Sequence, residues 1–257
     1  MRKLYNATGL LEAPRVDSRG RVLFSNVTEG GVYRRADGSV QTVIPARRGV
    51  GGIAVHADGG LVVTGRDVRY VHAGVEQSLL TLDGATGFND VTVGPDGALY
   101  VGVLRHRPMR GEPVVPSEVV RLGLDGSVAE AVTGVRWPNG LGFAPDGQTL
   151  YVCEYAESRV LAVRDGQKHV FATVAAGECD GLAVDAGGGV WVALGSGGAV
   201  ARFAPTGELV DTIELPGTFV SSLTFSGADL YLTTNSGLFT TVVDTTGAAV
   251  PPAGVPH

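Results

Sequence analysis

The hydrophobic positions of this chain fall into short runs in which apolar and polar residues alternate, with glycine, aspartate or proline between the runs. The runs are rich in β-branched and aromatic residues, which is typical of β-strands. The clearest of them are residues 21–25, 60–64, 98–102, 149–153, 189–193 and 229–233. A third run follows each of these, and often a turn and a fourth. No long segment has the apolar period and end caps of a helix, so we expect an all-β protein.

A longer repeat organises these runs. Six similar stretches precede the six runs, and their first residues are separated by 39, 38, 50, 41 and 41 positions. These first residues, called the slot residues below, are Glu12, Gly51, Asn89, Asn139, Asp180 and Ser221. A period near 40 with four strands per repeat is the sequence pattern of a β-propeller. A two-sheet sandwich also has short strands, but its strands would not repeat six times in phase.

We therefore expect one domain over residues 1–257, a six-bladed β-propeller. The last repeat is one strand short, and residues 3–8 are expected to supply that outer strand, which would close the ring and remove an exposed sheet edge. The approximate blades are residues 10–44, 50–82, 87–132, 136–174, 178–215 and 219–243.

Four of the slot residues carry side-chain oxygen. The first strand of each blade lines the central channel, so Glu12, Asn89, Asn139 and Asp180 are expected to converge at one end of it. Two carboxylates and two amides without Cys or His suit a hard cation, and Ca²⁺ is the first expectation. Mn²⁺, Mg²⁺ and Fe²⁺ remain open, and Zn²⁺ would be expected to recruit nitrogen or sulfur. The alternative is that these side chains only cap turns.

Composition narrows the class of protein. The net charge is −6, and Lys and Arg are scattered without a basic stripe, so neither nucleic acid nor an anionic membrane is an expected partner. No apolar h-region follows the first residues, and no apolar run approaches the roughly 18–20 residues of a membrane span. Only Cys153 and Cys179 are present. We expect both to be free thiols and the protein to be cytoplasmic; the oligomeric state stays open.

The motifs around the slots resemble the SMP-30/gluconolactonase/luciferin-regenerating (LRE) family of six-bladed lactonases. They are Glu12-Ala-Pro, Phe88-Asn-Asp, Pro138-Asn-Gly-Leu with Pro145-Asp-Gly, and Asp180-Gly-Leu-Ala-Val-Asp, which together cover nearly the whole chain. The resemblance implies that Glu12, Asn139 and Asp180 are metal ligands and that Asn89 is a ligand or a substrate contact. It also implies that Asp180 is the catalytic general base.

The chain departs from the family pattern at two positions. Gly87 stands before Phe-Asn-Asp, where many members have an arginine that grips sugar hydroxyls. Val16 follows Arg15 where a tryptophan is expected. Both changes imply a substrate less polar than a sugar-acid lactone.

The predicted reaction is the opening of a lactone by a metal-polarised carbonyl and an activated water. There is no Gly-x-Ser-x-Gly motif, so a serine nucleophile is not supported. One alternative is hydrolysis of a phosphotriester or aryl ester at the same metal. The other is a non-catalytic propeller that binds a ligand and holds a structural calcium.

The loops between second and third strands should overhang the metal, which makes Arg105 and Glu154 candidate substrate contacts. The longest of these loops, residues 105–116, is expected to form a lid with Met109 near its tip; a solvated basic loop is the alternative. Phe88 and Trp137 directly precede slot motifs and are candidate apolar pocket walls, although either residue can instead pack between blades.

The histidines are the remaining candidates for metal binding or catalysis. The five, His56, His72, His106, His169 and His257, show no metal-binding spacing and no paired partner. We expect His56 at the end of the channel opposite the slots, in a structural role.

Overall fold

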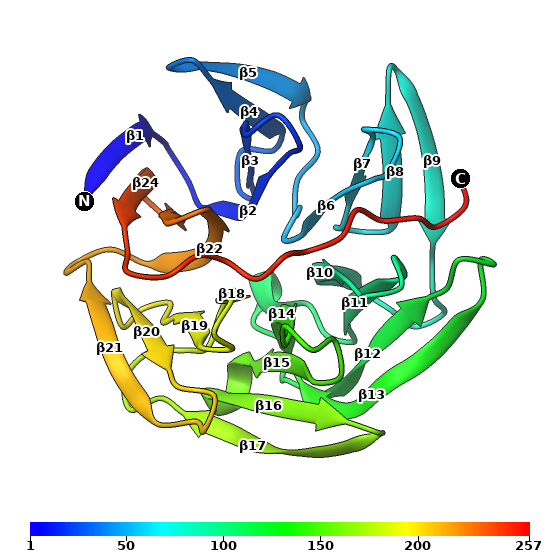
Figure 1. Cartoon of the computed structure of the whole chain (residues 1–257). Coiled ribbons are helices and arrows are strands. Elements are labelled where there is room, and N and C mark those ends of the chain that lie inside the picture. Colours follow the sequence, from blue (N-terminus) through cyan, green and yellow to red (C-terminus); the bar gives the residue numbers. More distant parts are fainter.

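The computed structural model describes residues 1–257 and shows six four-stranded antiparallel sheets arranged in a ring (Figure 1). The structure thus confirms an all-β six-bladed propeller. In each blade, strands adjacent in the sequence are adjacent in the sheet. This order follows from the short turns between runs, which permit only antiparallel neighbours.

The first three blades contain twelve strands. Blade 1 consists of β2 (Leu11–Val16), β3 (Val22–Asn26), β4 (Val32–Ala36) and β5 (Ser39–Ile44). Blade 2 consists of β6 (Ile53–Val55), β7 (Leu61–Val63), β8 (Val68–His72) and β9 (Val75–Leu80). Blade 3 consists of β10 (Gly87–Val93), β11 (Leu99–Leu104), β12 (Pro116–Leu122) and β13 (Val128–Arg136), with the 3-10 turn η1 (Pro108–Arg110) between β11 and β12.

The other three blades follow the same plan. Blade 4 consists of β14 (Pro138–Phe143), β15 (Leu150–Glu154), the 3-10 turn η2 (Tyr155–Glu157), β16 (Arg159–Arg164) and β17 (Gln167–Thr173). Blade 5 consists of β18 (Leu182–Val184), β19 (Val190–Ala193), β20 (Ala199–Phe203) and β21 (Leu209–Glu214). Blade 6 consists of β22 (Val220–Ser226), β23 (Asp229–Thr234), β24 (Gly237–Val242) and the N-terminal strand β1 (Arg2–Asn6).

Strand β1 closes the ring, because it pairs with the outer edge of β24 in the order β1-β24-β23-β22. The closing strand covers residues 2–6, close to the expected 3–8. Blade 3 differs more from the expected boundaries. Its outer strand runs to Arg136 rather than ending at 132, because β13 is nine residues long and follows β12 through two register shifts.

The hydrophobic core lies between the blades. Each of the six interfaces between neighbouring blades holds one cluster of buried apolar side chains. Inner strands such as β3 and β15 are buried along their whole length, whereas the outer strands β9, β17 and β21 are mostly exposed. Each fully buried Val or Leu contributes about 1.5–3 kcal/mol, so stability is shared around the ring and the inner strands are held most firmly.

Residues 244–257, called the strap below, leave blade 6 and cross the face of the ring to blade 2 (Figure 1). Backbone bonds hold the strap along the way. The amide of Ala248 donates to Val184 O at 2.9 Å, and that of Ala253 donates to Val55 O at 2.8 Å. Both acceptors lie at the ends of first strands, so the strap covers the end of the channel opposite the slots. The structure contains no helix with the length and apolar character that a membrane span requires.

Candidate active site in the central channel

The four oxygen-bearing slot residues lie at one end of the channel, where the first strands begin. Glu12 is the second residue of β2, Asn89 the third of β10 and Asn139 the second of β14; Asp180 stands two residues before β18. Glu12, Asn139 and Asp180 are buried and Asn89 is half-buried. The repeat in the sequence therefore places these side chains at equivalent positions around the axis.

The backbone is irregular at these positions. Strands β2, β10, β14 and β22 each have a register shift at the slot, for example between Glu12 and Arg15 and between Phe88 and Val91. Ala13 and Trp137, the neighbours of two slot motifs, have positive φ values of 52° and 64°. Bulges and left-handed residues re-aim side chains and are costly unless the surroundings hold them. The fold maintains this strain where the oxygens converge.

Two of the buried side chains are acids that repel each other. The pKa of Glu12 lies well above its usual range, because of burial first and then the negative charges of Asp180 and Asp90. The pKa of Asp180 is also well raised, by burial and by Asp90, although a hydrogen bond from Asn139 opposes the shift. The Oδ1 atom of Asp180 is buried and has no hydrogen-bond partner. A buried carboxylate oxygen without a partner is costly, so this arrangement calls for a positive charge.

Asp90 is a further buried acid near the slot residues, and the sequence repeat did not predict it. It is 3% exposed, and burial raises its pKa to about 6 against the opposing charge of Arg15. Arg15 Nη2 lies 3.5 Å from Asp90 Oδ1 and donates to Val91 O at 2.9 Å. In a regular strand, neighbouring side chains point to opposite faces. Residue 90 would then point away from the side that residue 89 faces. The bulge in β10 breaks this alternation, and the only signal in the sequence was the Asn-Asp pair itself.

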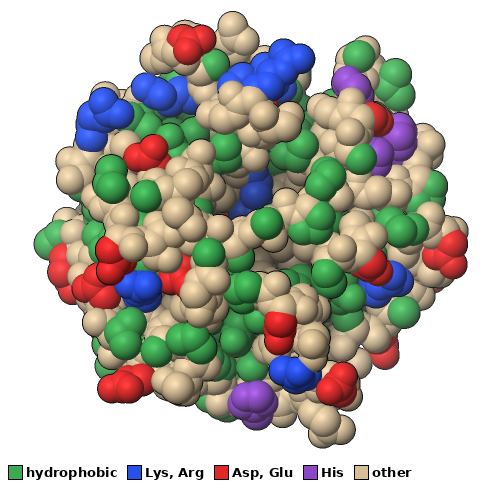
Figure 2. Space-filling view, in the orientation of Figure 1, with side chains coloured by type: hydrophobic (Ala, Val, Ile, Leu, Met, Phe, Trp, Pro, Cys, Tyr) green, Lys and Arg blue, Asp and Glu red, His purple; other side chains and the backbone are tan.

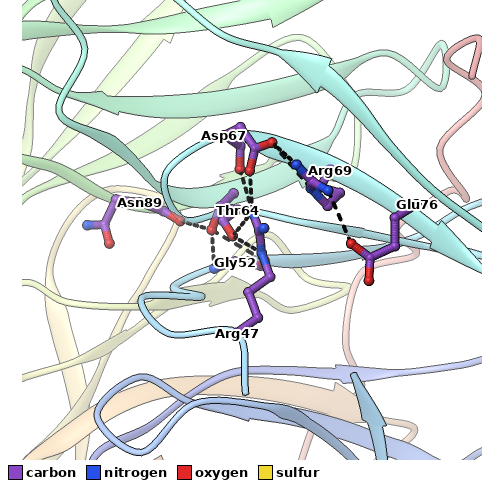
Figure 3. Close-up of polar contacts among 7 residues, drawn as sticks. All are labelled: Arg47, Gly52, Thr64, Asp67, Arg69, Glu76 and Asn89. Atoms are coloured by element: carbon purple, nitrogen blue, oxygen red, sulfur yellow. Dashed lines mark hydrogen bonds and ion pairs between the residues drawn. The ribbon is translucent and has the colours of Figure 1, made fainter. Parts of the chain in front are cut away.

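Asn89 is held by blades 2 and 4. Its Nδ2 donates to Pro138 O at 3.1 Å, and its backbone carbonyl accepts a 2.5 Å bond from Thr64 Oγ1 (Figure 3). Thr64 Oγ1 in turn accepts from the Gly52 amide at 2.8 Å. A Cβ atom on Gly51 would lie 2.7 Å from Asn89 Oδ1. Blade 2 therefore has glycine at its slot because the Asn89 side chain occupies that space.

These features fit a hard divalent cation. The donors are carboxylate and amide oxygens, the charge of Asp180 raises the pKa of Glu12, and one buried oxygen lacks a partner. Oxygen-only donor sets are those that Ca²⁺ prefers. Glu12, Asn89, Asn139 and Asp180 are the residues that would hold the ion.

Three of the predicted substrate contacts have other partners in the structure. Phe88 is 2% exposed and packs in the core between blades 2 and 3. Both carboxylate oxygens of Glu154 are engaged, by the Arg136 amide at 2.7 Å and by Arg159 Nε at 2.6 Å. Arg105 pairs with Glu118 and also donates to Asp83 O. The sequence could not show these partners, because they come from other strands and loops.

Trp137 remains on the rim as a half-buried side chain. Its ring lies 4.3 Å from that of Tyr155 and 5.2 Å from that of His106. The pKa of Tyr155 is raised by burial and by the charges of Asp180, Glu178 and Glu12, so this hydroxyl lies near the channel acids. His106 is buried with neither ring nitrogen bonded, and burial lowers its pKa. Met109, in η1 of the 105–116 loop, is 87% exposed.

A cavity lined mainly by apolar residues opens at the other end of the channel. It has a volume of about 410 Å³ and is lined by the lower parts of the first strands and by residues 248–252 of the strap. Figure 2 shows this face hollowed at its centre. Val16 lines this cavity, so its departure from the family pattern lies away from the acids. None of the four slot residues lines it, and the chemistry therefore places the candidate site at the slot end of the channel.

Comparison with known proteins agrees with this geometry. The model of the SMP-30/gluconolactonase/LRE-like region matches residues 10–236. The chain belongs to this lactonase family. The expected resemblance is confirmed, and the matched region includes all four oxygen-bearing slots.

Two curated relatives are lactonases. The pentonolactonase XacC of Haloferax volcanii is 31% identical over 204 residues, which is 73% of this chain and 68% of that protein. The 6-deoxy-6-sulfogluconolactonase of Pseudomonas putida is 30% identical over 241 residues, 85% of this chain and 80% of that protein.

Solved structures share the fold over nearly the whole chain. The gluconolactonase of Xanthomonas campestris has a TM-score of 0.82 at 29% identity and covers 95% of this chain and 88% of its own. A calcium-binding protein of Agrobacterium tumefaciens, regucalcin, has a TM-score of 0.85 at 22% identity, with 98% and 96% covered. At 22% identity, the similarity to regucalcin shows a shared fold.

Proposed function

We propose that this protein hydrolyses a lactone at the slot end of the channel, with a divalent cation held by Glu12, Asn89, Asn139 and Asp180. The observation that carries the proposal is the buried, unpartnered Oδ1 of Asp180 among converging oxygens. The lactonase activities of the relatives support the reaction class. Calcium is the proposed ion because of the donor set and because a protein of the same fold binds calcium.

A cation bound there supplies Lewis acidity, which polarises the lactone carbonyl and stabilises its oxyanion. Asp180 acts as the base: its Oδ1 accepts a proton from the attacking water, whose hydroxide adds to the acyl carbon. The ring C–O bond breaks and the proton passes to the leaving alkoxide, which gives a hydroxy acid. Asn139 orients Asp180 through their hydrogen bond. Burial raises the pKa of Asp180, which makes its carboxylate a stronger base.

The substrate is proposed to be less polar than a sugar-acid lactone. Gly87 is buried in β10 and contributes no guanidinium to the rim. The half-buried aromatic pair of Trp137 and Tyr155 lies near the acids and offers an apolar wall. The rim contacts still proposed are Trp137, Met109 and Asn89, since Phe88, Arg105 and Glu154 are occupied within the fold.

The test is proton release from a panel of sugar-acid, aliphatic and aromatic lactones, before and after chelation and with single metals added back. We expect chelator-sensitive acid release, and an aliphatic or aromatic ring preferred over sugar-acid lactones. Faster turnover of a sugar-acid lactone would reject the polarity proposal alone. No release with any metal on any ring would reject the lactonase proposal.

Single substitutions test the role proposed for each residue. Asp180→Asn is expected to lower kcat at least about 100-fold, because general-base catalysis contributes about 10²–10⁴-fold. Glu12→Gln removes one buried negative charge and should weaken Ca²⁺ binding at least about tenfold. Glu178→Gln is the matched control, since this nearby carboxylate bonds Ser196 outside the proposed ligand set. An unchanged calcium content in Glu12→Gln would contradict the ligand assignment.

A further inference from the structure

A second group of potential metal ligands lies on blade 2, at the strap end of the channel. His56 follows β6, Asp58 lies in the turn before β7, and His257 belongs to the strap. One ligand atom from each lies within 4.8 Å of the others. Figure 2 shows histidine side chains beside an acidic one on this part of the face. The expectation that no histidine has a paired partner is therefore wrong, because the strap brings together residues about 200 positions apart.

Hydrogen bonding fixes the proton on His56. Its Nε2 lies 3.0 Å from Val255 O in a buried environment. A carbonyl only accepts, so Nε2 carries a hydrogen, and in the neutral form of the ring the lone pair is at Nδ1. This Nδ1 lies 2.8 Å from Asp58 Oδ1. Two acceptors face each other, which requires a proton or a cation between them.

The surrounding groups orient the side chains of Asp58 and His257 toward each other. The Tyr70 hydroxyl donates to Asp58 Oδ2 at 2.6 Å, and the Gly60 amide donates to Asp58 Oδ1 at 2.8 Å. The Tyr70 ring packs against that of His257 at 3.8 Å. Histidine ligands usually donate their second N–H to a carbonyl or carboxylate, as His56 does to Val255.

The ligand atoms are in direct contact with one another, so an ion enters only when Asp58 turns away from the two histidines. His257 Nε2 lies 3.2 Å from Asp58 Oδ2, and His72 Nδ1 lies 3.6 Å from Asp58 Oδ1. The Asp58 and His257 side chains are each about one third exposed. Asp58 can therefore rotate slightly to admit an ion, and water can complete its coordination.

We propose that His56, Asp58 and His257 form a second cation site, of the Zn²⁺ type, which fastens the strap to blade 2. Two imidazoles and a carboxylate suit a borderline cation such as Zn²⁺, whereas the oxygen-only channel set suits Ca²⁺. The two ends of the molecule thus select different metals. Because strap residues 248–252 wall the 410 Å³ cavity, zinc binding at this site holds the strap in place beside that cavity. The proposal does not depend on the lactonase reaction.

The test is a Zn²⁺ titration by calorimetry on metal-free, full-length protein without a histidine tag, in saturating Ca²⁺ so that the channel is filled. We expect one Zn²⁺ to bind, and a rise in Tm of about 5 °C at a hundredfold excess over Kd. His257→Ala should weaken binding at least about tenfold. His169→Ala is the matched control, because this exposed histidine lies on β17 of blade 4, and it should bind zinc as the wild type does.

A second readout follows the strap itself. Zinc should slow amide hydrogen exchange in residues 251–257 of the wild type and leave it unchanged in His257→Ala. Absence of zinc binding, equal affinities of His257→Ala and His169→Ala, or loss of binding only in Asp180→Asn would each overturn the proposal.

Discussion

Glu12, Asp90 and Asp180 are three acidic side chains whose pKa values burial raises. The protein keeps them close to one another, and the one basic neighbour, Arg15, pairs with Asp90 and opposes the pKa rise of Glu12 only weakly. Three buried acids packed together without a compensating positive charge would only destabilise the fold. Their presence in a strained part of the backbone therefore indicates function, since strain and unpaired polar groups concentrate at sites where a ligand compensates for them.

Asp67 shows the opposite electrostatic situation at the same end of the ring. Burial pushes its pKa upward, but hydrogen bonds from Arg69 and Arg47, together with the Arg47 charge, outweigh burial and lower the pKa to about 2. Arg47 Nη2 lies 2.6 Å from Asp67 Oδ1 and also donates to Thr64 O (Figure 3). The ion pair thereby supports Thr64, whose hydroxyl holds the Asn89 backbone.

Asp67→Asn should destabilise the protein by at most about 2 kcal/mol at pH 7, the free-energy equivalent of the shift. A depressed pKa in the folded state contributes stability above the unfolded value, near pH 4, and loses it as pH falls toward 2. The difference between wild type and variant should therefore shrink from pH 4 downward. Urea unfolding at pH 7, 4 and 3 checks this result, with Asp165→Asn, a highly exposed turn residue, as control. A difference that does not change with pH would contradict the electrostatic account.

At the scale of elements, the sequence was most informative where it repeats. The short apolar runs predicted the strands, and the oxygen-bearing slots predicted which residues share one end of the channel. Local alternation could not predict the bulges that turn Asp90 inward, because a bulge depends on how two strands pair. The strap was missed for a related reason. Residues 244–257 have no strand pattern, and their bonds go to strand ends in blades 2 and 5.

The loop from Arg105 to Pro116 is the element whose role stays a prediction. Most of its residues are exposed, and Arg107 pairs with Glu112 at 3.1 Å within it. Met109→Ser should raise KM for the best lactone about five- to thirtyfold if the loop covers the substrate, because an apolar contact of this size contributes about 1–2 kcal/mol.

The melting temperature should not change in Met109→Ser, since the side chain is exposed. Leu124→Ser is the control: it removes an exposed apolar side chain in the β12–β13 turn, at the strap end of the ring. Steady-state kinetics on both variants decides the question. Equal KM values for Met109→Ser and wild type would favour the solvated-loop alternative.

At the scale of the whole molecule, the ring holds two ends with different chemistry. One end gathers buried acids and amides, and the other gathers histidines around the strap. Both depend on closure of the ring, because each site takes residues from blades that are far apart in the sequence. Closure in turn depends on β1, which pairs with β24 through partners such as Lys3 with Phe239 and Tyr5 with Leu238.

Removal of residues 1–6 should therefore lower the melting temperature by about 10 °C or more. It exposes the edge of β24 and the side of Leu238, which is fully buried in the intact ring, and each kcal/mol lost corresponds to about 2–4 °C in a protein of this size. The same deletion removes the contact of Tyr5 with Phe24, whose rings lie 5.4 Å apart. The open edge should also promote association, which sedimentation can measure.

A peptide of residues 1–8 added to the truncated protein should restore most of the lost melting temperature by adding a strand to the open edge. A peptide of the same composition in scrambled order should not, because the pairing register places Leu4 and Tyr5 against the cluster around Phe24 and Leu238. Calorimetry of the truncated protein with each peptide makes the comparison. If truncation left the melting temperature unchanged, blade 6 would be stable with three strands, and the ring would be closed by side-chain packing between blades 6 and 1 without the terminal strand.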